Sequence, residues 1–271
     1  MKKGSASLVV LSVIFLLTAL LIYLFEYVSI ERTMYTNRSK MKQYAYNEES
    51  LNNIITKDIE ETYLNGGDIH DIVGKDYSVF ENQKAVVSLN DPTAKHAFNI
   101  YYEEKLANKK KISRNTKYSL LNRIFFKDNP STKEKKDFCD EIVQANEVQN
   151  FSASEINNYF IDIEDIDARN FDYGNGNAIV KITVDDEDLN ANVNGSGIMI
   201  IEGDVSVKAN FYFRGLLIID GSLNIEGESD IMGALIDIDK ESNIDCFKSL
   251  NTMYRRCKTF KGIIKVTRSN Y

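Results

Sequence analysis

The sequence predicts an α+β protein with three parts: a long N-terminal transmembrane and amphipathic helix, a small α/β middle region, and a C-terminal three-faced β-solenoid. Three observations lead to this prediction. The chain starts with an uncharged apolar run, and neither Gly nor Pro occurs between Ser5 and Asn65. In the last third, small residues recur at every sixth position. Between them, large apolar residues alternate with other side chains, which is typical of short strands.

The N-terminal helix begins with a membrane segment. A basic leader, residues 1–4, precedes residues 5–25, a run of 21 residues without a charge. As a helix this run is ~31 Å long, enough to cross a bilayer core of about 30 Å. Bulky residues from Tyr23 to Val28 stand where a signal peptide needs small ones, so we expect the segment to stay on the protein. No later run approaches about 18 apolar residues, which predicts a single span.

Charge indicates the orientation of this span and excludes one class of function. Lys2 and Lys3 favour a cytoplasmic N-terminus and an extracytoplasmic ectodomain, although basic residues beyond the span oppose this: Arg32, Arg38, Lys40 and Lys42. From Gly4 onward the chain has 31 basic and 40 acidic residues. Such a surface repels phosphate groups. We therefore expect membrane lipid, through the apolar segment, but no nucleic acid among the partners.

Residues 26–65 continue the helix as an amphipathic segment. Its apolar residues fall mostly three, four or seven positions apart and predict one face: Tyr27, Ile30, Met34, Met41, Tyr44, Leu51, Ile55 and Ile59. Gly66 and Gly67 are expected to end the helix. We expect the outer half of this face to pack on a globular head.

Residues 66–150 predict a mixed α/β region. We expect strands at 77–80 and 85–89, and helices at 101–108, 117–126 and 133–148. The run of three lysines at 109–111 is typical of a solvated loop rather than a binding patch.

Residues 151–247 carry the repeat of the β-solenoid. Counted in sixes, every position is a residue that suits a tight corner: Asp185, Ala191, Gly197, Gly203, Ala209, Gly215, Gly221, Gly227, Gly233, Asp239 and Asp245. The inward positions between corners are large and apolar: Met199, Ile201, Val205, Val207, Phe211, Phe213, Leu217, Ile219, Leu223, Ile225, Ile231 and Leu235. We therefore predict a stack of short strands around an aliphatic and aromatic core.

The outward positions indicate the length of one solenoid coil. Apolar residues recur there every 18 residues, at Ile198/Ile200, Leu216/Ile218 and Ala234/Ile236. The intervening hexads are mostly polar: Asp204, Ser206, Asn210, Tyr212, Ser222, Asn224, Glu228 and Asp230. This pattern predicts an 18-residue coil with three faces, of which the apolar one must be covered. We expect the middle region or the stripe of the long helix to cover it, and residues 248–271 to form a C-terminal tail.

Patterns typical of catalysis are missing from the sequence. His70 and His96 have no second ligand or nucleophile at a recognisable spacing, so we expect structural roles for both, and neither a catalytic residue nor a cofactor. Hexapeptide repeats also occur in trimeric acyltransferases, which place an aliphatic residue before each small one. Here charged residues stand at that position: Glu202, Lys208, Arg214, Asp220 and Glu226. We therefore expect a protein that is not an enzyme.

Two acidic clusters raise the question of calcium, which needs about six to eight oxygen ligands. The first, Asp162, Glu164, Asp165 and Asp167, alternates with isoleucines and indicates a strand edge with its acids in water. The second is Asp185, Asp186, Glu187 and Asp188. We expect no metal at either cluster. Residues 174–177, Gly-Asn-Gly-Asn, predict a turn and not a phosphate loop.

The three cysteines are too few for a disulfide scaffold. Cys246 and Cys257 are close enough in sequence to pair in an oxidising compartment, which would leave Cys139 single. The alternative is three reduced, buried thiols.

The N-terminal residues carry a resemblance to a known family. Residues 3–10 read Lys-Gly-Ser-Ala-Ser-Leu-Val-Val, a basic leader that ends in Gly and is followed by Ser-Ala and apolar residues. Farther along the helix stand Glu31, Met34, Asn37, Ala45, Glu48 and Glu49. With these residues the chain resembles the minor pilins of type IV pili, most closely the PilX-like group. The resemblance covers about the first 50 residues well and about the last 70, a glycine-punctuated head, loosely.

The resemblance implies a processing site and a set of partners. A prepilin peptidase would cut after Gly4, Ser5 would become the mature and N-methylated terminus, and the helix would pack with other pilins. Most major pilins have Phe at the first mature position and Glu at the fifth, where this chain has Ser5 and Val9. That Glu offsets the charged terminus of a neighbour inside the filament. Its absence suits a tip or priming subunit.

Two classes of function follow. The first is a non-enzymatic minor pilin or pseudopilin that acts in assembly or at the tip of a type IV pilus-like filament at the cell surface. The second is a surface protein held in the cell membrane by an uncleaved anchor, with the solenoid as a binding scaffold. Processing by a prepilin peptidase separates the two.

Overall fold

The computed structural model describes residues 3–89, 96–105, 111–183, 188–239, 242 and 244–268. The chain divides into two units, one up to Asn53 and one from Ile54 onward, and each is described by itself. We call the second unit the head. The chain combines a long apolar N-terminal helix with mixed helices and strands, and part of the head is a β-solenoid, in agreement with the predicted class.

The first unit is formed by α1 (Lys3–Leu64), a single helix whose last turns belong to the head. Neither Gly nor Pro interrupts it beyond Gly4, which explains its length. The side chains from Leu8 to Gln43 are all exposed, and the most apolar window has a mean hydropathy of 2.9. This helix is long and apolar enough to cross a membrane.

The end of α1 lies at the glycine pair, as predicted. Gly66 has a φ of +80°, a left-handed conformation that glycine adopts without steric penalty. Its N–H donates to the Tyr63 carbonyl at 3.0 Å, and the Gly67 N–H donates to the Thr62 carbonyl at 2.9 Å. These bonds satisfy two of the carbonyl groups that a helix end leaves without intrahelical donors.

The last turns of α1 are part of the head. Ile55 and Ile59 are fully buried, and the Glu60 carboxylate accepts a hydrogen bond from the Val266 N–H at 2.9 Å. Val266 is near the C-terminus, so this bond joins two distant parts of the sequence. The predicted packing of the outer helix on a globular head is confirmed for these turns.

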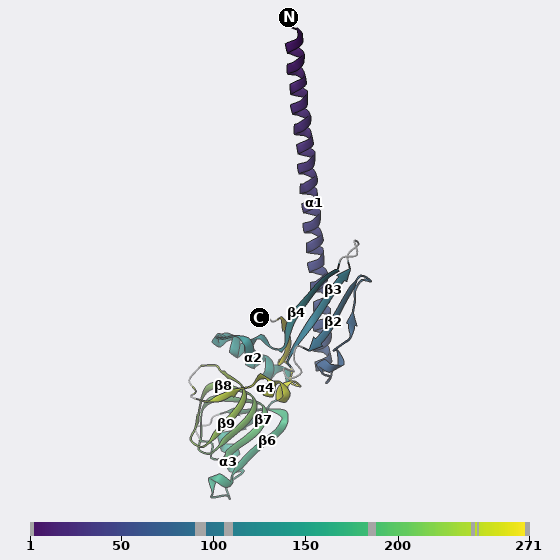
Figure 1. Cartoon of the computed structure of the whole chain (residues 1–271). Coiled ribbons are helices and arrows are strands. Elements are labelled where there is room, and N and C mark those ends of the chain that lie inside the picture. The colour runs from purple at the N-terminus through teal and green to yellow at the C-terminus, as the bar shows by residue number, and fades with distance from the viewer. Residues whose placement is uncertain are drawn as a thin grey trace. The chain divides into compact units, whose positions relative to one another are not determined.

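Five antiparallel strands form the first sheet of the head, in the order β1-β2-β3-β4-β11. Figure 1 shows β2, β3 and β4 side by side. They are β1 (Asp76–Tyr77), β2 (Gln83–Leu89), β3 (Ala97–Lys105), β4 (Lys111–Leu121) and β11 (Ile264–Arg268). On one face of this sheet the apolar side chains are buried: Ala85, Val87, Phe98, Ile100 and Leu120. β11 pairs with β4, with Ile264 opposite Leu121. Residues 122–263, which include the solenoid, are therefore inserted between two neighbouring strands of this sheet.

This sheet corrects several predictions for the middle region. The helix predicted at 101–108 is wrong, because residues up to Lys105 belong to β3, in which alternate side chains are buried. The helix predicted at 117–126 is also wrong, since it covers the end of β4 and a short 3-10 helix, η2 (Arg123–Phe126). The predicted strand at 77–80 is reduced to Tyr77, whereas 85–89 lies in β2. The first two lysines of the run at 109–111 lie outside the described residues, and Lys111 starts β4.

The helix predicted at 133–148 is present as α2 (Thr132–Ala145). Ser131 caps its start: the Ser131 hydroxyl accepts from the Glu134 N–H at 3.3 Å, and the Glu134 carboxylate accepts from the Ser131 N–H at 3.1 Å. The helix ends earlier than predicted because Asn146 is extended and its amide donates to the Ile142 carbonyl at 2.8 Å.

Six parallel strands form the second sheet, in the order β10-β9-β8-β7-β6-β5, and wind into a β-solenoid of about four turns. They are β5 (Gln149–Ser152), β6 (Asn170–Thr183), β7 (Asn192–Val207), β8 (Phe211–Ile225), β9 (Ser229–Asp237) and β10 (Cys246–Lys248). Short helices flank the sheets: η1 (Ile69–Asp71), α3 (Ala153–Asn158) and η3 (Ile166–Ala168).

The predicted inward side chains form the solenoid core. The predicted residues from Met199 to Leu223, together with Ile231, belong to one buried cluster, and Ile225 and Leu235 pack against it while partly exposed. Tyr173 and Phe213 stack in this core with ring centroids 6.5 Å apart. The alternation of inward and outward residues in the last third of the sequence is therefore confirmed.

The corners of the solenoid stack directly on one another. In the ladders, Gly215 lies opposite Gly197 on one side and opposite Gly233 on the other. Gly215 has a φ of +149°, and a Cβ atom there would lie 2.0 Å from the Gly197 carbonyl oxygen. A larger residue cannot occupy this position without moving the backbone of the neighbouring coil.

The outward apolar residues of the solenoid are covered, as predicted. Four of them have at most 2% of their surface exposed: Ile198, Ile200, Leu216 and Ile218. The main cover is α4 (Leu250–Cys257), which lies against β7, β8 and β9 and buries Met253, Tyr254 and Cys257. The predicted cover was the middle region or the long helix. The structure mainly uses the stretch 248–271, expected only as a tail, which contains α4 and β11, while α2 of the middle region contacts the solenoid through Lys135 and Lys136.

Two contacts fix α4 to the segment around the end of α1. The Tyr254 hydroxyl hydrogen-bonds the Tyr63 hydroxyl, and the Lys258 ammonium forms an ion pair with Asp68. Partial burial alone would raise the pKa of Asp68, but the hydrogen bond and charge of Lys258 lower it below its ordinary value of 3.8. The folded head therefore favours the ionised form of Asp68.

Phe213→Ala should lower the free energy of unfolding by ~3–5 kcal/mol, because it empties a fully buried position in the solenoid core. Tyr212→Ala is the matched control, since that ring faces outward on the same strand and is partly exposed. Denaturant unfolding of the detergent-solubilised chain measures both. Equal losses would contradict the inward register.

Ile218→Asp should destabilise the head strongly, because it places a charge without a partner beneath α4. Asn224→Asp introduces the same carboxylate on an exposed position of β8 and should change the thermal midpoint little. Comparable midpoints for the two variants would show that α4 does not cover this face in solution.

Asp68→Asn should lower the thermal midpoint at pH 7, and the difference from wild type should shrink in acid. The lowered pKa means that the ion pair stabilises the head fully above about pH 4–5 and is lost as the pH falls through the folded-state value. Asp76→Asn removes a more exposed ion pair with Lys84 and serves as the control. A difference that persists unchanged at pH 2 would contradict the electrostatic origin.

Candidate functional site

The predicted processing residues lie at the start of α1. The helix begins at Lys3, so Gly4 and Ser5 are both in its first turn, directly before the apolar segment. Cleavage at this point stays a prediction. The residues that follow are all helical up to Leu64, so the leader and the head are joined by one continuous element.

The two histidines do not form a site with each other in any described contact. His70 is exposed in η1. His96 lies next to β3, where its Nδ1 is 2.8 Å from Asn251 Oδ1 of α4 and its ring stacks on Phe126. His96 thus links the first sheet to the helix that covers the solenoid.

The first acidic cluster lies in the exposed segment between α3 and β6. The strand edge predicted there is wrong, because this segment contains only η3. The Asp165 carboxylate accepts from the Asp167 N–H at 3.1 Å and caps this short helix. Among the described residues, no group of three His, Cys, Asp or Glu side chains is placed to hold a metal ion.

The second acidic cluster falls mostly outside the described residues, which include only Asp188 from it. Asp188 pairs with Lys208 at 3.3 Å. The turn predicted at 174–177 is wrong, since β6 runs through these residues and its ladder with β7 is irregular there. An irregular strand, not a reversal of the chain, explains the two glycines.

The three cysteines are free thiols, so the predicted alternative of a bond between Cys246 and Cys257 is wrong. The Cys257 thiol, at the end of α4, is buried against the solenoid and donates to the Gly197 carbonyl at 3.1 Å. Burial raises the pKa of Cys139 to about 11 and also raises that of Cys246. Protonated thiols are weak nucleophiles, which argues against a catalytic role.

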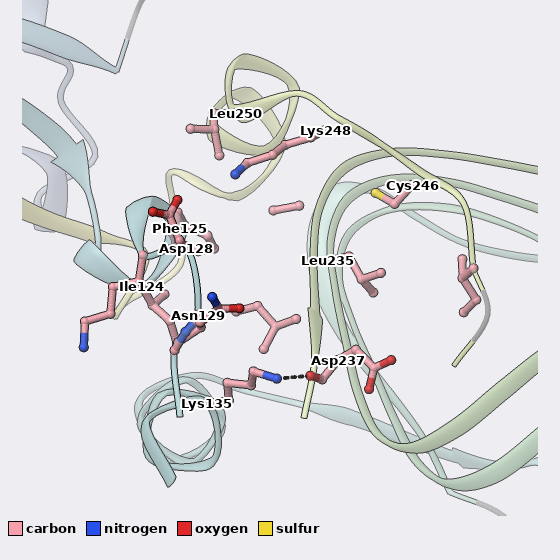
Figure 2. Close-up of a pocket in the computed structure, with 15 residues that line it drawn as sticks. Ile124, Phe125, Asp128, Asn129, Lys135, Leu235, Asp237, Cys246, Lys248 and Leu250 are labelled. Atoms are coloured by element: carbon pink, nitrogen blue, oxygen red, sulfur yellow. Dashed lines mark hydrogen bonds between the residues drawn. The ribbon is translucent and has the colours of Figure 1, made fainter. Parts of the chain in front are cut away.

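A cavity of about 400 Å³ opens in the head between three chain segments (Figure 2). Phe125 and Asp128, from η2 and the loop that follows it, line the first wall. Leu235 and Asp237 of β9 line the second. Cys246 of β10 lies on the third, which continues to the start of α4. The cavity is therefore lined both by apolar side chains and by the backbone at the edge of β9.

Two lysines of the cavity are held in fixed positions. Lys135 of α2 is only 5% exposed and donates to the Asp237 carbonyl (Figure 2). It also donates to the Ile238 carbonyl at 3.2 Å. Lys127 forms an ion pair with Glu134. The hydrogen bonds from Lys127 and then from Ser131 lower the pKa of Glu134 to about 2. Fixed positive charge therefore lies beside the free end of β9.

The sequence did not reveal this cavity, because its walls come from three separate regions. A partial signal was present in Ser131 and Glu134, which form a capping box and fix where α2 starts. Comparisons of the chain with protein-family models, with curated proteins and with solved structures return no match.

Proposed function

We propose that the chain is a non-enzymatic minor pilin or pseudopilin that acts in assembly or at the tip of a type IV pilus-like filament. The observation that supports this most is the continuity of α1, which starts at the basic leader, includes the apolar segment and ends within the head. A subunit of this kind needs one helix both to sit in the membrane and to carry the head. The resemblance of residues 3–10 to PilX-like proteins supports the same function.

In this proposal a prepilin peptidase cuts after Gly4 on the cytoplasmic side and leaves Ser5 as the methylated terminus. The apolar part of α1 then contacts lipid and the helices of other pilins. Val9 offers no carboxylate to a neighbour's charged terminus, and a charge without a partner in apolar surroundings is costly. The subunit therefore belongs at the tip or in the priming complex rather than in the bulk of the filament.

The head would then be an extracytoplasmic module with a three-faced solenoid of 18-residue coils. The ladders support this coil, because Val193 lies opposite Phe211 and Phe211 lies opposite Ser229. The stacked corner glycines support it as well. A close-packed stack of this kind is stiff, which suits a module presented at the end of a filament or at the cell surface.

A second candidate function is a surface protein with an uncleaved anchor and a solenoid that serves as a binding scaffold. The cavity beside β9 favours this possibility, since it offers apolar walls and an open strand edge. The two candidates share the head and differ in what happens at Gly4.

Processing at Gly4 tests the first proposal. Co-expression with a prepilin peptidase should give a mature chain that starts at Ser5, because the enzyme would remove the four-residue leader. Gly4→Val should abolish the cleavage, whereas Ser7→Val, an added bulky group on the same helix, should leave it intact. Intact-mass measurement of the purified chains reads out the terminus. A wild-type chain that keeps Met1 in the presence of an active peptidase would favour the anchored surface protein.

A further inference from the structure

The six-stranded sheet ends in a strand that is only partly paired. β10 pairs with β9 at Ile231, Met232 and Gly233, and no described strand lies beside residues 234–237 on that side. On its other side β9 is paired with β8 up to Asp237. The cavity occupies the place where a further strand would lie.

The hydrogen bonds around β9 show which backbone groups face this space. The Gly233 carbonyl accepts from the Ser249 N–H at 2.7 Å, and the Asp237 carbonyl accepts from Lys135 Nζ, both on the open side. The Ile238 N–H instead donates to the Ile219 carbonyl of β8. Backbone groups of alternate residues point to opposite sides of a strand. The N–H and C=O of Leu235 therefore point into the cavity.

The side chains around this edge are arranged as a strand would need them. Phe125, Ile124 and Leu250 lie on one side of the β9 ribbon, and Leu235 and Cys246 lie on the other (Figure 2). A strand added here would place alternate side chains on these two sides. The inner side is apolar, whereas the outer side mixes apolar residues with Asp128, Asn129 and Lys248, so the space fits a strand whose inward residues are apolar.

We propose that this edge binds an extended apolar peptide segment of a partner protein, which pairs in parallel with β9 through the N–H and C=O of Leu235. The strand that pairs with the other edge of β9 indicates which residues a guest peptide would need. Leu216, Leu217 and Ile218 pair with the opposite edge of the same strand, and their rung ends in Asp220, which pairs with Lys136 of α2 at 3.3 Å. Lys135 of α2 lies at the end of β9 and favours an acidic residue at the corresponding end of the guest peptide.

Two features of the site bear on strand addition: the buried charge of Lys135 and the open backbone of Leu235. Lys135 is buried although it is charged, and it binds the Asp237 carbonyl at the end of the edge and the Ile238 carbonyl just beyond it, but leaves the backbone of Leu235 open. Backbone pairing supplies affinity that does not depend on side-chain identity, while the apolar walls select for size and shape. This proposal does not depend on whether the leader is cleaved.

A labelled peptide copied from residues 214–221, Arg-Gly-Leu-Leu-Ile-Ile-Asp-Gly, tests the proposal on the detergent-solubilised full chain. The peptide should bind saturably in fluorescence anisotropy, and it should slow alkylation of Cys246 but not that of Cys139, as mapped by mass spectrometry. The same peptide with two alternate backbone amides methylated on the edge that faces β9 should bind at least tenfold more weakly. Absence of saturable binding, or equal binding of the methylated peptide, would overturn the proposal.

Leu235→Pro tests the edge from the side of the protein. It removes the Leu235 N–H, which faces the cavity, and leaves the bonds from β9 to β8 in place. Leu235→Ala loses the same side chain but keeps the N–H, so the proline variant should bind at least tenfold more weakly than the alanine variant. Equal affinity of two folded variants would overturn the proposal. If the proline variant does not fold, the methylated peptide and the protection of Cys246 on the wild-type chain decide the question.

Discussion

The contact between α4 and the outer face of the solenoid is the interaction on which the head depends. Apolar burial stabilises by about 25 cal/mol per Å², and Ile198, Leu216 and Ile218 would otherwise lie in water. The helix that covers them stands between β10 and β11 in the chain, so the cover also positions the strand that completes the first sheet. Tyr63 and Asp68 then fix α4 to the end of α1. One short helix therefore couples the two sheets and the last turns of the long helix.

The solenoid was predictable from sequence because its backbone constrains residue type directly. A Cβ atom at Gly215 would meet the carbonyl oxygen of the neighbouring coil, and the same restriction holds at Gly221 and Gly233, so the repeat of small residues is visible in the sequence. The choice of inward residues was predictable as well. Side chains of a strand alternate between its two sides, and the large apolar side chains of the repeat all lie on the side that faces the core. The start and end of the membrane-length helix were equally visible, because Gly66 is the first glycine after Gly4.

The first sheet and the cavity were not predictable because partners far apart in sequence decide them. Tyr101 to Glu104 have no local feature that excludes a helix, and they form a strand because β2 and β4 pair on both sides. The short helix α4 was hidden in an apparent tail, and only the solenoid face opposite it explains why Met253 and Cys257 are buried. Leu235 looks like any other inward residue until the pairing pattern shows that its backbone is open.

The open edge of β9 also bears on how such a head avoids aggregation. A strand edge with unpaired N–H and C=O groups invites association with other chains, and proteins limit this with short strands, covering loops and lysines. This head applies all three: β10 has three residues, the loop after η2 forms the wall opposite β9, and Lys135 binds the terminal carbonyl groups. What remains accessible is the backbone of Leu235, with apolar side chains on the inner side and a mixed wall on the outer side. A gap of that size excludes a second folded sheet but admits a single extended segment, so the devices that prevent aggregation are the same ones that would give the proposed site its selectivity.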